Sequence, residues 1–86
     1  MLKDIAFVNR GFARSQVFKL LEKPMTPTQL AKSLGKHRAS VSEILAVLTK
    51  SGYAKPITAQ GKKYTLYALT KKGKTVLQEI KKMGLE

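Results

Sequence analysis

The chain of 86 residues contains no cysteine, and its only histidine is His37. Without cysteine there can be no disulfide, no thiolate nucleophile and no thiolate ligand for a metal ion. His37 has no cluster of carboxylates beside it in the sequence, so we predict no metal site and no cofactor. Packing alone must hold the fold together.

Long hydrophobic runs are also missing. The N-terminal segment MLKDIAFVNRGF lacks the apolar stretch of about 7 to 15 residues that marks a secretory signal. No other run approaches the roughly 18 apolar residues that span a bilayer. We therefore expect a soluble, cytoplasmic protein with no membrane partner.

Carboxylates are scarce and scattered, at Asp4, Glu22, Glu43, Glu79 and Glu86. No pair of them, and no serine with the single histidine, forms the nucleophile and base that general acid–base catalysis needs. A glycine-rich phosphate loop is absent as well. The sequence predicts that this protein is not an enzyme, and no small-molecule ligand is evident.

Positive charge is abundant: 17 basic against 5 acidic residues give a formal net charge of +12. Residues 44–78 hold no carboxylate but carry seven lysines, namely Lys50, Lys55, Lys62, Lys63, Lys71, Lys72 and Lys74. Lysine used for solubility or heat tolerance normally brings glutamate with it. An unbalanced basic surface instead favours a nucleic-acid partner.

The length allows a single domain, residues 1–86. Apolar residues fit helical spacing from Ile5 to Leu21, with a possible break at Gly11. Thr26 followed by proline predicts the start of a second helix, which Gly35 ends. A third helix, 38–50, has apolar residues at i, i+3, i+4 and i+7, and these two helices form a helix-turn-helix over about residues 27–51.

Beyond Gly52 the apolar period changes from helical to alternating. The alternation of residues 53–58 and 63–69, with a turn at 59–62, predicts a β-hairpin over about residues 53–69. A last helix, about 71–83, is capped by Thr70 and buries Val76, Leu77 and Ile80, with Met83 as a further candidate. The predicted fold class is α+β: a winged helix-turn-helix with a three-helix core, a two-stranded wing and a C-terminal helix.

Residues 24–53, PMTPTQLAKSLGKHRASVSEILAVLTKSGY, resemble the core of small archaeal and bacterial winged-helix regulators related to the multiple-antibiotic-resistance and arsenic-repressor families. The matching positions are Thr26, Leu30, Ala31, Gly35, Val41, Ser42, Leu45, Leu48, Lys50, Ser51 and Gly52, followed by the step from Leu69 to Gly73. The resemblance implies a transcriptional regulator that pairs through helices outside the winged core. Metal sensing, known among the arsenic repressors, has no support in these residues.

The major groove of DNA admits one α-helix, whose N-terminal half reaches the base edges. Arg38 is expected to bind guanine or a phosphate, and Ala39 to touch a thymine methyl. Ser40 and Ser42 can donate hydrogen bonds, although Ser42 equally well faces the turn between the helices. Glu43 either accepts from cytosine or, as we favour, pairs with a neighbouring lysine.

The wing tip, with Gln60, Lys62 and Lys63, suits the phosphates or a narrow minor groove. Lysines there also keep a hairpin edge from pairing with other chains. The remaining candidates for contact with DNA are Thr26, Lys36, His37, Lys50 and Lys55, and the lysines at 71, 72 and 74 are expected to add peripheral phosphate contacts.

Tyr53, Tyr64 and Tyr67 could stack on single-stranded bases. For Tyr53 and Tyr67 we favour a place in the core.

The predicted function is a sequence-specific regulator that binds double-stranded DNA. Two alternatives remain: a non-specific DNA-coating or chromatin protein, and a protein-interaction module of a transcription or replication complex. We also expect a homodimer. The stretch that contains Ile5, Phe7, Val8 and Phe12, and the last helix, are the candidate interfaces.

Overall fold

The computed structural model describes residues 1–58, 61 and 64–84. The chain begins with two short helices, α1 (Leu2–Val8) and α2 (Phe12–Leu20). The predicted break at Gly11 is confirmed, because this residue precedes α2 with φ at 85°, a conformation that glycine adopts without strain. Arg14 reaches back across the break and donates a hydrogen bond of 3.0 Å to the carbonyl oxygen of Phe7.

The helix-turn-helix consists of α3 (Pro27–Leu34) and α4 (Arg38–Lys50). Thr26 caps α3 reciprocally with Gln29: the Thr26 hydroxyl accepts from the Gln29 amide, and the Gln29 side chain accepts from the Thr26 amide. Gly35 ends α3 in the left-handed conformation, with φ at 62°, so the chain turns sharply into α4. Both boundaries agree with the sequence prediction.

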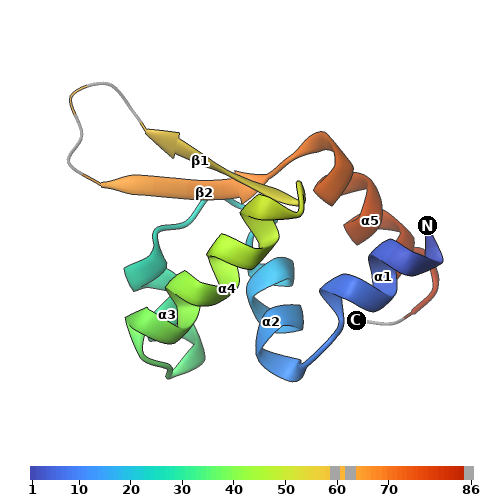
Figure 1. Ribbon diagram of the computed structural model, residues 1–86, viewed down its shortest axis with the longest axis horizontal. Helices are drawn as coiled ribbons and strands as arrows, with labels where there is room; N and C mark the ends of the chain where they lie inside the picture. Colours follow the sequence, from blue (N-terminus) through green and yellow to red (C-terminus); the bar gives the residue numbers. More distant parts are fainter. Residues whose placement is uncertain (59–60, 62–63, 85–86) are drawn as a thin grey trace.

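The hairpin pairs β1 (Ala54–Thr58) with β2 (Thr65–Leu69) in antiparallel register, from Ala54 opposite Leu69 to Thr58 opposite Thr65. The expected alternation of buried and exposed residues is wrong for β1, where only Ala54 is buried. The reason is that the hairpin projects from the helices, as Figure 1 shows, so both faces of its outer part meet solvent. Ile57 is accordingly 37% exposed.

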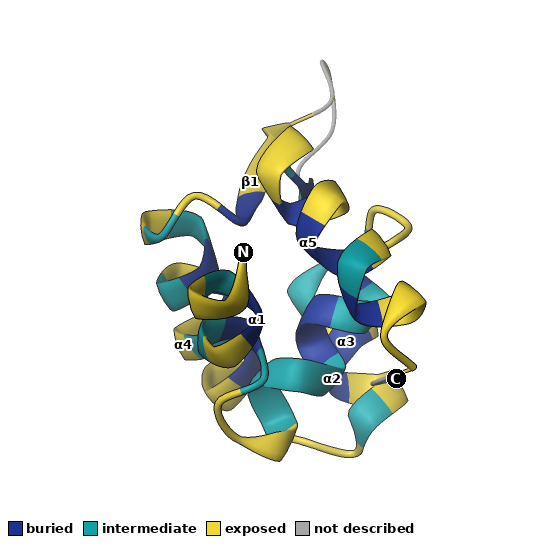
Figure 2. Ribbon diagram, turned by 90° about the vertical axis from the view of Figure 1, so that its right-hand side faces the viewer, coloured by how far each residue is buried: buried dark blue, intermediate teal, exposed yellow. Residues whose placement is uncertain are grey.

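The last helix, α5 (Lys71–Lys82), begins at Thr70, whose hydroxyl accepts from the Gly73 amide. Its buried side is formed by Gly73, Val76, Leu77 and Ile80, as predicted for the last three. Met83 lies beyond the end of α5 and is 50% exposed, so its expected place in the core is wrong. Figure 2 shows the buried sides of α1, α2, α3 and α5 turned towards one another around the core.

Tyr53, predicted for the core, is buried and joins three parts of the chain. Its hydroxyl donates a 2.5 Å hydrogen bond to Asp4 of α1, and its ring stacks on Phe7. The Nζ atom of Lys72 in α5 lies 3.8 Å from the Asp4 carboxylate and 4.5 Å from the centre of the Tyr53 ring. This cluster fastens α1 and α5 to the base of the hairpin.

The structure changes the set of apolar residues that are free for a partner chain. Ile5 and Val8 are buried, and Phe7 packs against Tyr53 within the same chain. These three residues of the expected dimer stretch are therefore not available on the surface. Phe12, next to the helix break, is 77% exposed, and Leu2, at the start of α1, is 73% exposed.

Candidate nucleic-acid interface

An open groove of about 350 Å³ lies between the start of α3, the start of α4 and the second strand of the wing. Three of the predicted site residues, Thr26, Arg38 and Ser42, line it together. The other residues of its wall are Pro27, Thr28, Tyr64, Thr65 and Tyr67. Residues that are far apart in the sequence thus meet where the helix-turn-helix joins the hairpin.

The position of the wing relative to the helices depends on a short backbone bridge. The amide of Met25 donates to the carbonyl of Tyr67 at 3.0 Å, and the amide of Tyr67 donates to the carbonyl of Met25 at 2.8 Å. The residue before Thr26 therefore acts as a one-residue third strand beside β2. This bridge holds the groove in shape, and nothing in the sequence pattern predicted it.

The α3 end of the groove carries a partial positive charge. The first helical residues, Pro27 and Thr28, line the groove, and the dipole of the helix places its positive end there. No acidic residue occupies the first turn of α3 or of α4. The N-termini of α3 and α4 and the guanidinium of Arg38 therefore favour an anion in the groove.

The outer face of α4 carries three short side chains, followed by Lys50 at its end. Ala39, Ser42, Ala46 and Lys50 follow one another at spacings of three or four residues and are all exposed, while Val41, Leu45 and Leu48 are buried on the opposite side. Small residues let a helix approach DNA bases closely. Ser42 is exposed and lines the groove, and its contact with DNA stays a prediction.

Glu43 lies on the exposed side of α4, next to Ser42. The ion pairs formed by the described residues join Lys72 to Asp4 and Lys81 to Glu22, and neither involves Glu43. The expected pairing of Glu43 with a lysine is therefore not found in the described part of the chain. The reason is geometric: the neighbours one helical turn away are Ala39 and Val47, neither of which carries charge.

The other predicted residues surround the groove without lining it. Lys36, His37, Ala39 and Ser40 are exposed in the turn before α4 and in its first turn. Lys50 and Lys55 are exposed as well, but they lie at the end of α4 and the start of β1, so the structure does not bring them into the groove. Gln60, Lys62 and Lys63 lie outside the described residues, as does most of the predicted turn.

Sequence reasoning missed Thr28, Thr65 and Ala46, and it proposed Tyr64 only as a partner for single strands. Helical spacing could have predicted Ala46, because it follows Ser42 by four residues on the same exposed face. Tyr64 is 49% exposed and directly precedes β2, at the outer end of the paired strands. No pattern in the sequence connects Tyr64 or Thr65 with α3, since the connection is made by the tertiary fold.

The lysines of α5 lie apart from this groove. Figure 1 shows α5 at one end of the molecule and α3 with the start of α4 at the other, along a long axis of 38 Å. Lys72 forms an ion pair with Asp4 and lies over the ring of Tyr53. The expectation that the lysines at 71, 72 and 74 add peripheral phosphate contacts stays a prediction, and such contacts would lie away from the groove.

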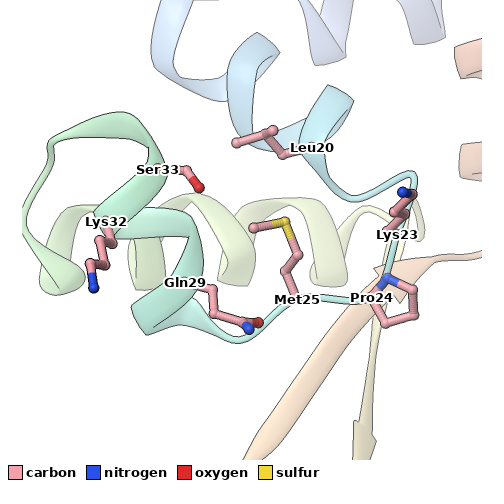
Figure 3. Close-up of a pocket in the computed structure, with 7 residues that line it drawn as sticks. All are labelled: Leu20, Lys23, Pro24, Met25, Gln29, Lys32 and Ser33. Carbon is pink, nitrogen blue, oxygen red and sulfur yellow. The ribbon is translucent and has the colours of Figure 1, made fainter.

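A second hollow, of about 530 Å³, lies between the end of α2 and the outer side of α3. Figure 3 shows its apolar floor of Leu20, Pro24 and Met25, with Lys23 and Lys32 at its rim. Gln29 and Ser33 complete the lining. The backbone of Met25 and the side chain of Gln29 are already used in the wing bridge and the α3 cap.

Within residues 1–58, 61 and 64–84, no three His, Cys, Asp or Glu side chains lie close enough to hold a metal ion. The helices described there are all too short or too polar to cross a bilayer.

Comparison with known proteins agrees with the geometry. Residues 16–56, from α2 into β1, match the model of the IclR helix-turn-helix domain. Among solved structures, RV1404 from Mycobacterium tuberculosis superposes with a TM-score of 0.79 over 93% of this chain. The fold is a winged helix-turn-helix. The sequence identity to RV1404 is 20%, and 58% of that chain is covered.

Two further structures have the same winged helix-turn-helix fold. The adhesin competence repressor AdcR from Streptococcus pyogenes gives a TM-score of 0.76 at 21% identity and covers 93% of this chain and 63% of its own. A variant of ZitR from Lactococcus lactis gives a TM-score of 0.68 at 25% identity, and the match covers 79% of this chain and 50% of the ZitR chain. The chain thus spans between half and two thirds of the length of these proteins. No curated protein matches the sequence.

Proposed function

We propose that this chain is a transcriptional regulator of the cytoplasm that binds specific sites on double-stranded DNA. The observation that carries the proposal is the groove in which Thr26, Arg38 and Ser42 meet the second strand of the wing, beside the exposed small residues Ala39 and Ala46 of α4. In this arrangement α4 enters the major groove, and the sugar–phosphate backbone lies between α4 and the wing. The net charge of +12 adds non-specific attraction.

Each side chain has a role in this proposal. Arg38 binds guanine or the phosphate in the groove, and Ser42 donates a hydrogen bond next to it. Ala39 and Ala46 allow close approach and contact thymine methyl groups. Glu43, which has no ion pair in the described part of the chain, is free to accept from the amino group of cytosine.

Further contacts with DNA surround the central residues Arg38 and Ser42. Thr26 and Thr28 present the start of α3 to a phosphate, and the hydroxyl of Tyr64 extends this contact from the wing. Gln60, Lys62 and Lys63 of the wing bind the backbone or the minor groove. The exposed residues Lys36, His37, Ser40, Lys50 and Lys55 supply contacts on either side.

Within the winged-helix regulators, we place the chain near the multiple-antibiotic-resistance and arsenic-repressor families. The support is the set of residues that carries the resemblance, in which Thr26 caps α3 and Gly35 and Gly52 take positive φ values at the ends of the two helices. The match to an IclR-type domain supports the broader class.

The first test is a selection of binding sites from a randomised duplex library at about 0.15 M salt, where non-specific attraction is weakened. An enriched inverted repeat with half-sites about 10 base pairs apart supports a dimeric, sequence-specific regulator. No enrichment, with binding that fades as salt rises, supports the DNA-coating protein instead. A protein-interaction module would bind no duplex under these conditions.

The role of Arg38 can be tested with the selected site. We expect Arg38→Ala to weaken binding by roughly 10- to 100-fold, the range for one bidentate contact. The control is Lys23→Ala, which removes the same charge from an exposed loop residue outside the groove. Equal effects of the two substitutions in fluorescence anisotropy would show that only net charge matters.

We also propose a homodimer that forms through the exposed apolar residues Leu2 and Phe12. Both side chains are more than 70% exposed, which is costly in a small soluble domain and suits a partner chain. The exposed side of α5 is rich in lysine and would repel its own copy, so α5 is the weaker candidate. Sedimentation velocity should show a dimer that Phe12→Ser dissociates, and a monomer at all concentrations contradicts the proposal.

A further inference from the structure

The exposed side of α5 carries four lysines, with Thr75 and Gln78 between them. Its residues recur at helical spacing and are Lys71, Lys74, Thr75, Gln78, Lys81 and Lys82, all exposed. This set, called here the α5 lysine face, contains no carboxylate and no apolar side chain. Glu79, the single acid of the helix, is half-buried to one side.

The described carboxylates near this face leave three of its four lysines without an ion pair. Asp4 is engaged by Tyr53 and Lys72, and Glu22 pairs with Lys81 at one edge. Within the described part of the chain, no ion pair involves Lys71, Lys74 or Lys82. From Lys71 to Lys82 the helix rises about 16 Å, the length of roughly five base-pair steps.

The α5 lysine face and the groove belong to different parts of the molecule. Figure 1 shows α5 at the opposite end of the long axis from α3, and Figure 2 shows its exposed residues on the side turned away from the start of α4. A duplex held by α4 and the wing therefore leaves the α5 lysine face open.

We propose that the α5 lysine face binds the phosphate backbone of a second DNA duplex, so that the chain bridges two duplexes. Phosphates are the partner that fits a row of flexible ammonium groups without apolar neighbours. This inference rests on the proposed function, because the first duplex is the one that α4 and the wing bind.

Two other polyanionic partners fit the α5 lysine face less well. A helix that binds a membrane surface needs apolar side chains to insert, but Val76, Leu77 and Ile80 of α5 are buried in the core. The centre of a protein interface is depleted in lysine and enriched in aromatic residues, whereas α5 has no aromatic residue at all.

The test uses two variants of equal net charge. The face variant replaces Lys71, Lys74 and Lys82 by Gln, and the control variant replaces Lys3, Lys19 and Lys23 by Gln. Both remove three lysines from positions outside the core and outside the groove. The affinity for one labelled duplex is measured by fluorescence anisotropy, and bridging is measured as capture of a labelled duplex by a second duplex on beads.

We expect the wild-type chain and the control variant to capture the second duplex. The face variant should lose at least tenfold in capture while its affinity for a single duplex stays within about twofold of that of the control.

Capture by the face variant equal to that of the control would overturn the proposal, because another surface or a dimer would then be bridging. A wild-type chain that binds one duplex but captures no second one overturns it as well and leaves the proposed function intact. Binding of the wild type, but not of the face variant, to anionic phosphatidylglycerol vesicles without bridging would assign the face to a membrane instead. Absence of any duplex binding contradicts the proposed function itself.

Discussion

The space around a residue can determine which amino acid is tolerated there, and Gly73 is an example. Gly73 is internal to α5 and has an ordinary helical conformation, so its role is not backbone freedom. A Cβ atom placed there would lie 2.1 Å from the carbonyl oxygen of Tyr53 and 3.2 Å from the Cβ of Leu69. The absence of a side chain lets α5 pack directly on the backbone at the base of the hairpin.

Gly73→Ala is therefore expected to destabilise the protein, although alanine is the better helix former. Forcing a methyl group into this contact should lower the free energy of unfolding by about 1–3 kcal/mol. Chemical denaturation followed by circular dichroism measures the change. Gln78→Ala, at an exposed position of the same helix, is the control and should have little effect; a stable Gly73→Ala variant would show that α5 can shift away.

At the scale of elements, the N-terminal helices and α5 are joined through Tyr53. Burial and the hydrogen bond to Asp4 raise the pKa of Tyr53 to about 12 from its ordinary value of 10. The same hydrogen bond lowers the pKa of Asp4, with Lys72 and the N-terminus contributing in the same direction and burial opposing them. Both shifts favour the neutral phenol beside the ionised carboxylate.

A pH dependence of stability follows from the Tyr53 shift. Between pH 10 and about 12 the unfolded chain loses the phenol proton while the folded chain retains it. The contribution of Tyr53 is therefore complete below pH 10 and is lost as the pH rises towards 12. Urea unfolding of the wild type and Tyr53→Phe should show this loss only in the wild type; parallel curves would mean that the phenol titrates normally in the folded chain.

At the scale of the whole molecule, a net charge of +12 accompanies two separate surfaces that favour anions. The groove carries Arg38 and the helix dipoles, and the α5 lysine face carries most of its own lysines unpaired. Binding to any duplex should therefore depend steeply on salt.

We expect the affinity for a non-specific duplex to fall about 10³-fold between 50 and 200 mM salt, as for a protein with at least six phosphate contacts. Anisotropy titrations at several salt concentrations give the slope. If Arg38 binds a phosphate, Arg38→Ala lowers this slope by about one contact; if Arg38 binds guanine, the slope is unchanged and sequence preference relaxes instead. A slope near zero for the wild type would contradict an electrostatic interface.

The local features of this protein were determined by its sequence. The helix break at Gly11, the Thr26 cap, the Gly35 turn and the order of helices and hairpin depend on residues within one or two turns of each other. Such short-range rules also predicted that Arg38 and Ser42 lie at the start of a solvent-facing helix. The spacing of apolar residues along the chain therefore predicts the order of helices and strands of a winged helix.

Only the tertiary structure decided which of these parts meet. The bridge between Met25 and Tyr67 joins residues 42 positions apart, and the packing of Phe7 on Tyr53 joins residues 46 positions apart. Tyr64 meets the starts of α3 and α4 in the groove, although it lies at least 22 positions from them in the sequence. The tertiary structure also places α5 away from the start of the recognition helix. Contacts of this kind depend on how elements pack in three dimensions, and no periodicity in the sequence records them.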